Sequence, residues 1–314
     1  MRLLLSTAAF LAAGPALAEP PQVVADTPVT ASLVMQVIGD EGKVQVLLPQ
    51  GASPHHHQMR PSDAQNLQQA DLLVWTGPDL TPWLDRAAAT LAGDVGQLRL
   101  LEVAGTHLRP YDDDHGPEDE GHDDHGEDDE GHDEPGHDDH AGATDPHAWL
   151  DPDNARIWLA AIADSLAAVD PDGRDTYAAN AAAAADRIAS LDRDLQARLA
   201  PYAETSLVVL HDAYGYFTDH FGLKPAIPVA LGDATTPSAA RLSAIRDRIA
   251  ASGAVCAFPE YASDPRAMDT ITEGTGIRRG GELSPEGGGP ASADLYPDLI
   301  AGIAETLTEC LSEG

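Results

Sequence analysis

The sequence has few positive charges. Lys and Arg together number 18, against 52 Asp and Glu, so the formal net charge is -34 at pH 7. This balance excludes a nucleic acid as a partner, because binding to a phosphate backbone needs Lys and Arg to neutralise it. Acidity alone does not establish cation binding. Sixteen of the acidic residues lie within residues 112–140, so much of the charge is a local feature.

Long hydrophobic runs are also missing beyond the N-terminus. Residues 3–17 form an apolar run that follows Arg2 and leads into the small residue Ala18, as a signal peptidase site requires. The run is shorter than the roughly 20 residues of a membrane span, and no basic flank follows it, so a cleaved signal is favoured over a membrane anchor. We therefore predict an export signal over residues 1–18 and a mature periplasmic protein, with any membrane function supplied by a partner.

Cysteine is scarce too, with only Cys256 and Cys310 in the whole chain. An even number of cysteines in an exported protein favours a disulfide. The competing interpretation is a zinc site with two cysteines. It is less favoured, because neither cysteine has a Cys or His close to it in the sequence.

Short β-like runs alternate with amphipathic helical stretches in both halves of the chain. The expected strands are residues 22–25, 44–48, 71–76, 98–103, 206–210, 224–229 and 254–258. This alternation is typical of βαβ units around a parallel sheet. We therefore predict an α/β fold with two lobes, each containing a small, mostly parallel sheet flanked by helices.

A long helix is expected between the two lobes. Ile188, Leu191, Leu195 and Leu199 fall on one helical stripe, downstream of an Ala-rich stretch. The predicted organisation is an N-terminal metal-binding lobe over residues 19–170, one rigid connecting helix over residues 171–200 and a C-terminal lobe over residues 201–314.

Residues 112–140 have almost no apolar side chains and contain the unit Gly-His-Asp-Asp-His twice. Such a segment cannot bury a core, so we expect a disordered loop inserted in the first lobe. Imidazole and carboxylate groups both bind zinc, which predicts weak auxiliary metal binding; the alternative is an acidic solvating segment with incidental histidines. The histidines concerned are His115, His122, His125, His132, His137 and His140.

Three histidines outside this segment have positions typical of a binding site. His55 follows the expected strand 44–48, His211 follows strand 206–210, and His147 precedes a helix start at Asp151. The carboxyl ends of strands in an open α/β sheet face the ligand crevice. Three neutral imidazoles suit tetrahedral Zn²⁺, whereas Mn²⁺ favours more carboxylate oxygen. Taken singly, each histidine is better explained without a metal: His147 as a hydrogen-bond partner of Asp145 or Asp151, His211 as a satisfied residue at a strand end, and His55 as a surface histidine whose neighbours His56 and His57 are alternative ligands.

The motifs around these histidines resemble a known family, the zinc-specific solute-binding proteins of bacterial ABC importers, of the ZnuA type. The resemblance covers nearly the whole mature chain. It is carried by residues 48–55 (LPQGASPH), 60–63 (RPSD), 70–72 (ADL), 145–152 (DPHAWLDP) and 211–217 (HDAYGYF). The family also has an acidic, His-rich insertion before the fourth of these motifs and a cysteine pair like Cys256 and Cys310.

The resemblance implies that His55, His147 and His211 ligate Zn²⁺. The fourth position is left to water, Glu260 or another loop carboxylate. For Glu260, a place in the cleft, as a ligand or behind the ligands, is favoured no more than a place as a solvated loop acid or a partner at a helix end. Manganese-binding relatives are expected to carry an acid where this chain has Ser284, although Glu282 and Glu286 lie nearby. His107 and His220 match no motif and are predicted to be structural or on the surface.

The function implied by the resemblance is capture of Zn²⁺ in the periplasm and its delivery to the permease of an ABC importer in the inner membrane, by a monomer that is not an enzyme. One alternative is a secreted zinc buffer or adhesin without a transporter. Another is a zinc hydrolase, because three histidines and an open water position also describe catalytic sites. The hydrolase is less favoured, because the chain has no His-Glu-x-x-His motif.

Overall fold

The computed structural model of the protein describes residues 20–39, 42–93, 95–111, 143–230, 232, 238–264 and 266–313. The predicted export signal and the histidine-rich segment 112–140 lie outside these residues. Within the described part of the chain, no helix is both long and apolar enough to cross a membrane.

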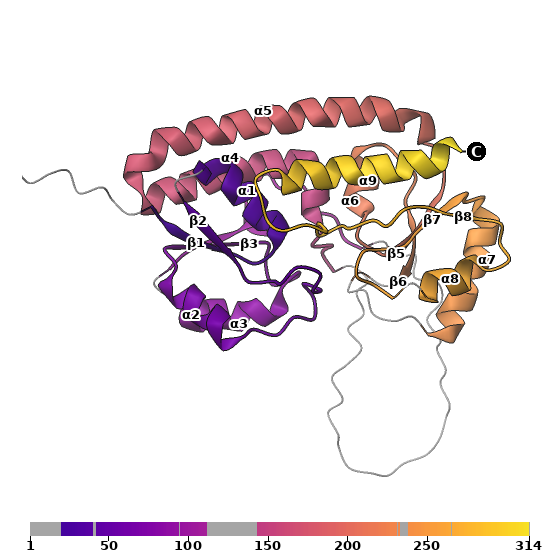
Figure 1. Cartoon of the computed structure of the whole chain (residues 1–314), viewed down its shortest axis with the longest axis horizontal. Helices are drawn as coiled ribbons and strands as arrows, with labels where there is room; N and C mark the ends of the chain where they lie inside the picture. The colour runs from indigo at the N-terminus through magenta and orange to yellow at the C-terminus, as the bar shows by residue number, and fades with distance from the viewer. Residues whose placement is uncertain are drawn as a thin grey trace, which may run out of the picture.

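The first lobe is built on a parallel sheet with strand order β2-β1-β3-β4. Its strands are β1 (Gln22–Ala25), β2 (Lys43–Val46), β3 (Leu72–Trp75) and β4 (Gly96–Arg99). Helices α1 (Pro28–Ile38) and α4 (Pro152–Val169) cover one face, and α2 (Pro61–Gln69) and α3 (Pro82–Leu91) cover the other (Figure 1). All four residues of β3 are buried, as expected for a strand covered on both faces.

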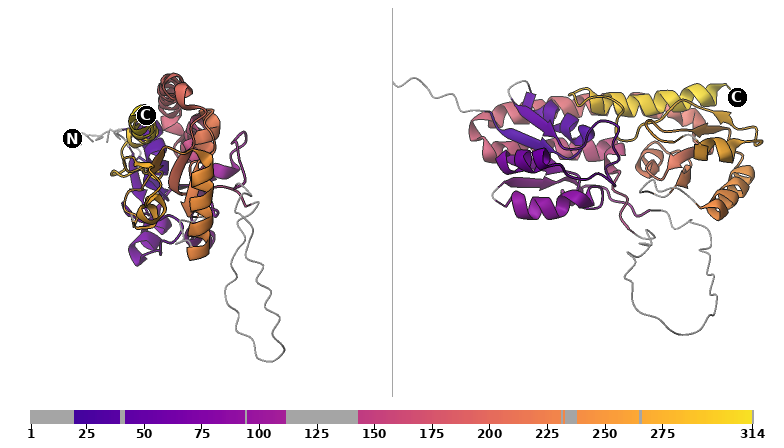
Figure 2. Two further views of the ribbon diagram at one scale, coloured as in Figure 1. Left: turned by 90° about the vertical axis from the view of Figure 1, so that its right-hand side faces the viewer. Right: turned by 60° about the horizontal axis from the view of Figure 1, so that its bottom comes forward.

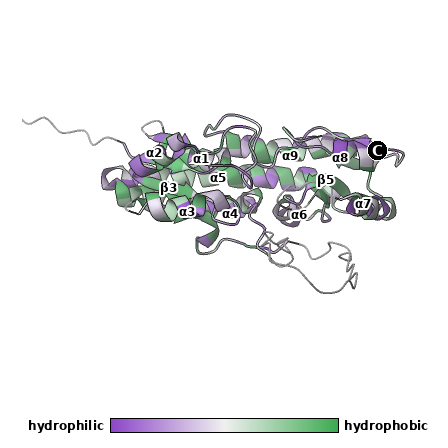
Figure 3. Ribbon diagram, turned by 90° about the horizontal axis from the view of Figure 1, so that it is seen from below, coloured by the Kyte–Doolittle hydropathy of each residue, from purple (hydrophilic) through white to green (hydrophobic). Residues whose placement is uncertain are grey.

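The second lobe repeats this plan with strand order β6-β5-β7-β8, again with parallel pairs. Its strands are β5 (Leu207–His211), β6 (Ile227–Ala230), β7 (Cys256–Phe258) and β8 (Arg278–Arg279). Helices α7 (Ala239–Ser252) and α8 (Arg266–Thr272) pack on one face, while α6 (Gly215–His220) and α9 (Leu295–Ser312) lie on the other. The β3 and β5 ribbons are mostly hydrophobic (Figure 3).

One long helix, α5 (Arg174–Leu199), runs past both lobes, and α9 lies beside it (Figures 1 and 2). Ile188, Leu195 and Leu199 of the expected stripe are buried against the common core. The helix begins later than residue 171, because Pro171–Gly173 forms a separate 3-10 turn. The prediction of a two-lobed α/β fold with a long joining helix is confirmed.

The predicted strand 224–229 begins three residues too early, because β6 spans Ile227–Ala230. Two larger differences concern β4 and β8. The run 98–103 was expected to be a strand, but β4 ends at Arg99, and Leu100–Glu102 forms a 3-10 turn. Leu100 and Leu101 are nevertheless buried, so their hydrophobicity reflects core packing in a turn rather than strand structure. Strand β8 was missed because its two residues, both Arg, carry no apolar pattern.

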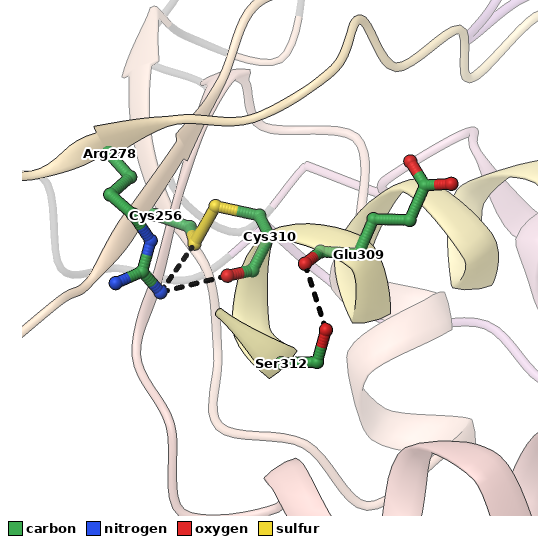
Figure 4. Close-up of a disulfide and its surroundings, with 5 residues drawn as sticks. All are labelled: Cys256, Arg278, Glu309, Cys310 and Ser312. Carbon is green, nitrogen blue, oxygen red and sulfur yellow. Dashed lines mark hydrogen bonds between the residues drawn. A yellow bond between two sulfur atoms is a disulfide. The ribbon is translucent and has the colours of Figure 1, made fainter. Parts of the chain in front are cut away.

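The predicted disulfide is present between Cys256 on β7 and Cys310 on α9. Both cysteines are buried, and the Arg278 guanidinium donates a hydrogen bond of 2.8 Å to the Cys310 carbonyl (Figure 4). The bond therefore ties the sheet of the second lobe to the C-terminal helix.

Replacing both cysteines with Ser is expected to destabilise the protein by about 4 kcal/mol, because the bond closes a loop of 54 residues in the unfolded chain. Urea denaturation of the variant and of the wild type, without reductant, measures the difference. Wild-type protein in reductant should resemble the variant. An unchanged midpoint in both comparisons would contradict the expectation.

Candidate metal centre

His147 lies at the start of the turn Ala148–Leu150, which leads into α4, and its side chain is fully buried. Its Nδ1 is 2.7 Å from Asp145 Oδ1, and its backbone N–H donates to the same oxygen at 3.0 Å. The carboxylate therefore holds the proton on Nδ1. The other ring nitrogen, Nε2, is buried with no hydrogen-bond partner. Its lone pair is available to a metal ion.

His211 is the last residue of β5, at the carboxyl end of the strand. Its Nδ1 is 2.6 Å from Glu260 Oε2, and its backbone N–H donates to Glu260 Oε1 at 3.2 Å. The Tyr214 hydroxyl donates to the same carboxylate at 3.2 Å. The Nε2 atom of His211 is also buried without a hydrogen-bond partner. Each lobe thus presents one buried imidazole nitrogen, oriented by a carboxylate behind it.

His55, on the loop between β2 and α2, completes a group of three imidazoles. Its ring centroid is 5.4 Å from that of His147 and 6.5 Å from that of His211, and the last two are 5.3 Å apart. His56 is exposed, and the His57 ring packs against Trp83 at 4.9 Å. The loop therefore turns the first histidine of the triplet toward the other two.

One carboxylate lies close to the three histidines, at the fourth position that the sequence did not assign to one residue. Glu286 offers an oxygen that lies, with one nitrogen from each histidine, in a group whose members are all within 4.8 Å of one another. Glu260 is not in this group, because its carboxylate contacts the far nitrogen of His211. A cavity of about 150 Å³ opens beside the group, lined in part by His55, His211 and Glu286.

The loop that carries Glu286 is held by residues of the first lobe. The Trp149 indole N–H donates to the Pro285 carbonyl at 2.7 Å, and the Gln50 amide donates to the Gly288 carbonyl at 2.7 Å. Trp149 follows His147 by two residues. The site is therefore assembled from residues of both lobes: loops of each lobe and the end of strand β5.

Burial and the neighbouring carboxylates give the site groups different proton affinities. Burial holds the pKa of His147 well below 6.5, and the nearby His211 lowers this pKa further. Burial also acts to lower the pKa of His211, but the Glu260 carboxylate outweighs it and raises that pKa to about 9. Burial raises the pKa of Glu286 to about 7. Without a metal ion, His211 is therefore an imidazolium at neutral pH, 3.9 Å from Glu286.

The two remaining histidines of the described residues lie elsewhere, as predicted. The Nδ1 atom of His107 is 3.0 Å from Asp151 Oδ2, and this side chain is half exposed. His220 lies with Asp151 and Asp153 in a second group of nearby metal-ligand atoms. Both ring nitrogens of His220 already contact carboxylates, those of Asp151 and Asp192.

The fold and the convergent side chains define a two-lobed protein with a candidate cation site between its lobes. The chain belongs to the family described as zinc-uptake complex component A, periplasmic, whose sequence model matches residues 23–310.

Two relatives illustrate the match. The chain is 54% identical to the high-affinity zinc uptake system protein ZnuA of Paracoccus denitrificans, over 98% of this chain and 97% of the relative. It is 36% identical to the protein of the same name from Brucella suis, over 90% and 89%.

Solved structures share the fold. The periplasmic zinc-binding protein TroA from Treponema pallidum superposes with a TM-score of 0.75 at 19% identity, over 93% of this chain and 99% of that one. A crystal structure of a ZnuA protein gives a TM-score of 0.73 at 22% identity, over 92% and 98%.

Proposed function

We propose that this protein captures Zn²⁺ in the periplasm and delivers it, as a monomer, to the permease of an ABC importer. His55, His147, His211 and Glu286 are the proposed ligands. The observation that carries the proposal is the pair of buried Nε2 atoms, one from each lobe, which have no hydrogen-bond partner and converge with the other two side chains. The names of the relatives, high-affinity zinc uptake proteins, support this cargo and this role.

The chemistry of the donor set favours zinc. Three imidazole nitrogens and one carboxylate oxygen suit a tetrahedral Zn²⁺, whereas Mn²⁺ prefers more oxygen ligands. Asp145 and Glu260 hold the protons of His147 and His211 on Nδ1, so that Nε2 of each ring faces the ion.

The same set favours binding over catalysis. A catalytic zinc site keeps one position open for water or substrate, while a site closed by four protein ligands does not. Here Glu286 supplies the fourth ligand atom. We therefore infer that the site holds and releases its ion without a chemical reaction.

Zinc binding at pH 8 is expected to release about one proton from His211, because its pKa of about 9 makes it an imidazolium at that pH. Below pH 7 the release should grow, since Glu286 with a pKa of about 7 then also carries a proton. Zinc affinity should therefore rise with pH up to about 9 and fall more steeply below pH 7. Titration calorimetry in buffers of different ionisation enthalpy measures the released protons.

Glu260→Gln is the matched variant, because it removes the negative charge that raises the pKa of His211. Proton release at pH 8 should then fall by about one relative to the wild type, while the other ligands contribute equally to both proteins. Equal release by the two proteins would contradict the proposed ligation by His211. Absence of zinc binding by the wild type would overturn the proposed function itself.

A further inference from the structure

His220, the last residue of α6, joins three helices through its imidazole ring. Its Nδ1 is 2.9 Å from Asp151 Oδ1, and its Nε2 is 2.7 Å from Asp192 Oδ1. Asp151 caps the N-terminus of α4, where its other contacts include the backbone N–H of Asp153 at 2.9 Å. Asp192 belongs to α5, the helix that joins the lobes.

This contact is buried and charged. The side chains of His220 and Asp151 are 9% and 7% exposed. Burial lowers the pKa of His220, but the two carboxylates outweigh it and raise that pKa to about 9. At neutral pH a buried imidazolium therefore lies between two carboxylates. Removing one member of such a group is costly, because the remaining charges stay buried and unpaired.

Two of the three helices joined by His220, α6 and α4, begin just beyond proposed zinc ligands. Helix α6 starts at Gly215, four residues after His211, and the cap residue Asp151 lies four residues after His147. The first turn of α6 is also tied to the His147 segment, because the Tyr216 hydroxyl donates to the Asp145 carbonyl at 2.9 Å. Helix α6, which follows His211, therefore contacts the chain on both sides of His147: Tyr216 near its start bonds to Asp145, and His220 at its end contacts Asp151.

We propose that His220 is a positioning residue of the metal centre, which fixes the distance between His147 and His211 by tying α6 to the cap of α4. This proposal rests on the proposed zinc site. The contact to Asp151 carries the effect, since Asp151 belongs to the segment of His147, while the contact to Asp192 anchors α6 to the joining helix. His55 and Glu286 lie on loops outside this connection.

Two amide substitutions separate the two contacts. An Asn amide at position 220 can donate from the place of Nδ1 and keep the contact to Asp151, whereas a Gln amide can donate from the place of Nε2 and keep the contact to Asp192. We expect His220→Gln to accelerate zinc dissociation about tenfold, the lower end of the effects seen for residues behind metal ligands. His220→Asn should accelerate it by less than about threefold.

Zinc dissociation is measured by transfer to an excess of a fluorescent chelator. The visible spectrum of the Co²⁺-loaded protein, which reports ligand geometry, should change in His220→Gln and be largely retained in His220→Asn. His107→Gln is the control, because His107 also contacts Asp151 but is half exposed and belongs to the first lobe. It should match the wild type in both measurements.

Equal dissociation rates and equal spectra for His220→Asn and His220→Gln would overturn the positioning role. This also holds if both variants release zinc faster only because both have lost thermal stability. A wild-type rate in all three variants would overturn it as well. If His211→Ala binds zinc as the wild type does, the proposed zinc site itself is wrong. These results distinguish failure of the inference from failure of the proposed function.

Discussion

Replacing His211 with Ala is expected to weaken zinc binding by about 100- to 1,000-fold. Binding to a protein site with four ligands contributes about 10–16 kcal/mol, so one ligand accounts for roughly 3–4 kcal/mol. His211 brings the one proposed nitrogen ligand of the second lobe. The other histidine described in that lobe, His220, has both ring nitrogens in contact with carboxylates, so it cannot replace His211. Competition with a chelator of known affinity measures the loss.

His107→Ala is the control for this variant, because it also removes an imidazole near the first lobe's His147 segment without removing a proposed ligand. It should bind zinc as the wild type does. In cells that lack the native gene, the wild type and His107→Ala should restore growth at limiting zinc, whereas His211→Ala should not. Comparable affinities for the two variants would refute ligation by His211.

The core of the fold could be predicted because buried parallel strands are recognisable in a sequence. Strands β3 and β5 are short, continuous apolar runs bounded by helical patterns, and each is buried along its length. The same signal failed at residues 100–102, where a buried turn is as hydrophobic as a strand. It also failed at β8, which consists of two Arg residues.

The candidate site could be predicted only where its residues follow strands or lie in recognisable motifs. His211 ends a strand, and His55 and His147 lie in motifs of the family. Glu286 has neither signal, because a Gly-rich loop carries it and its place depends on contacts with Trp149 and Gln50 of the other lobe. His220 also gave no signal, since its partner Asp192 lies 28 residues away on another helix.

Replacing Glu286 with Gln is expected to weaken zinc binding by about 10- to 100-fold, less than the loss of an imidazole, because water can fill a vacated fourth position. The substitution keeps the size of the side chain and removes its charge. Mn²⁺ should lose relatively more affinity than Zn²⁺, since Glu286 supplies the only oxygen of the four-residue group and manganese prefers oxygen ligands. Titration of the metal-free variant with each ion measures both effects.

Glu282→Gln is the matched control, because it makes the same change of charge on an exposed residue near the start of the same loop. Above pH 8, where Glu286 is ionised, the two substitutions change the long-range attraction between the acidic protein and a cation to a similar extent, so a difference between them is local. The Glu286 variant should also lose the extra proton release below pH 7, because that proton is bound by Glu286 when its pKa is about 7. If the two variants bound zinc equally, the fourth ligand would be water rather than Glu286. The site would then have the open coordination position that catalytic zinc sites keep and closed four-ligand sites lack.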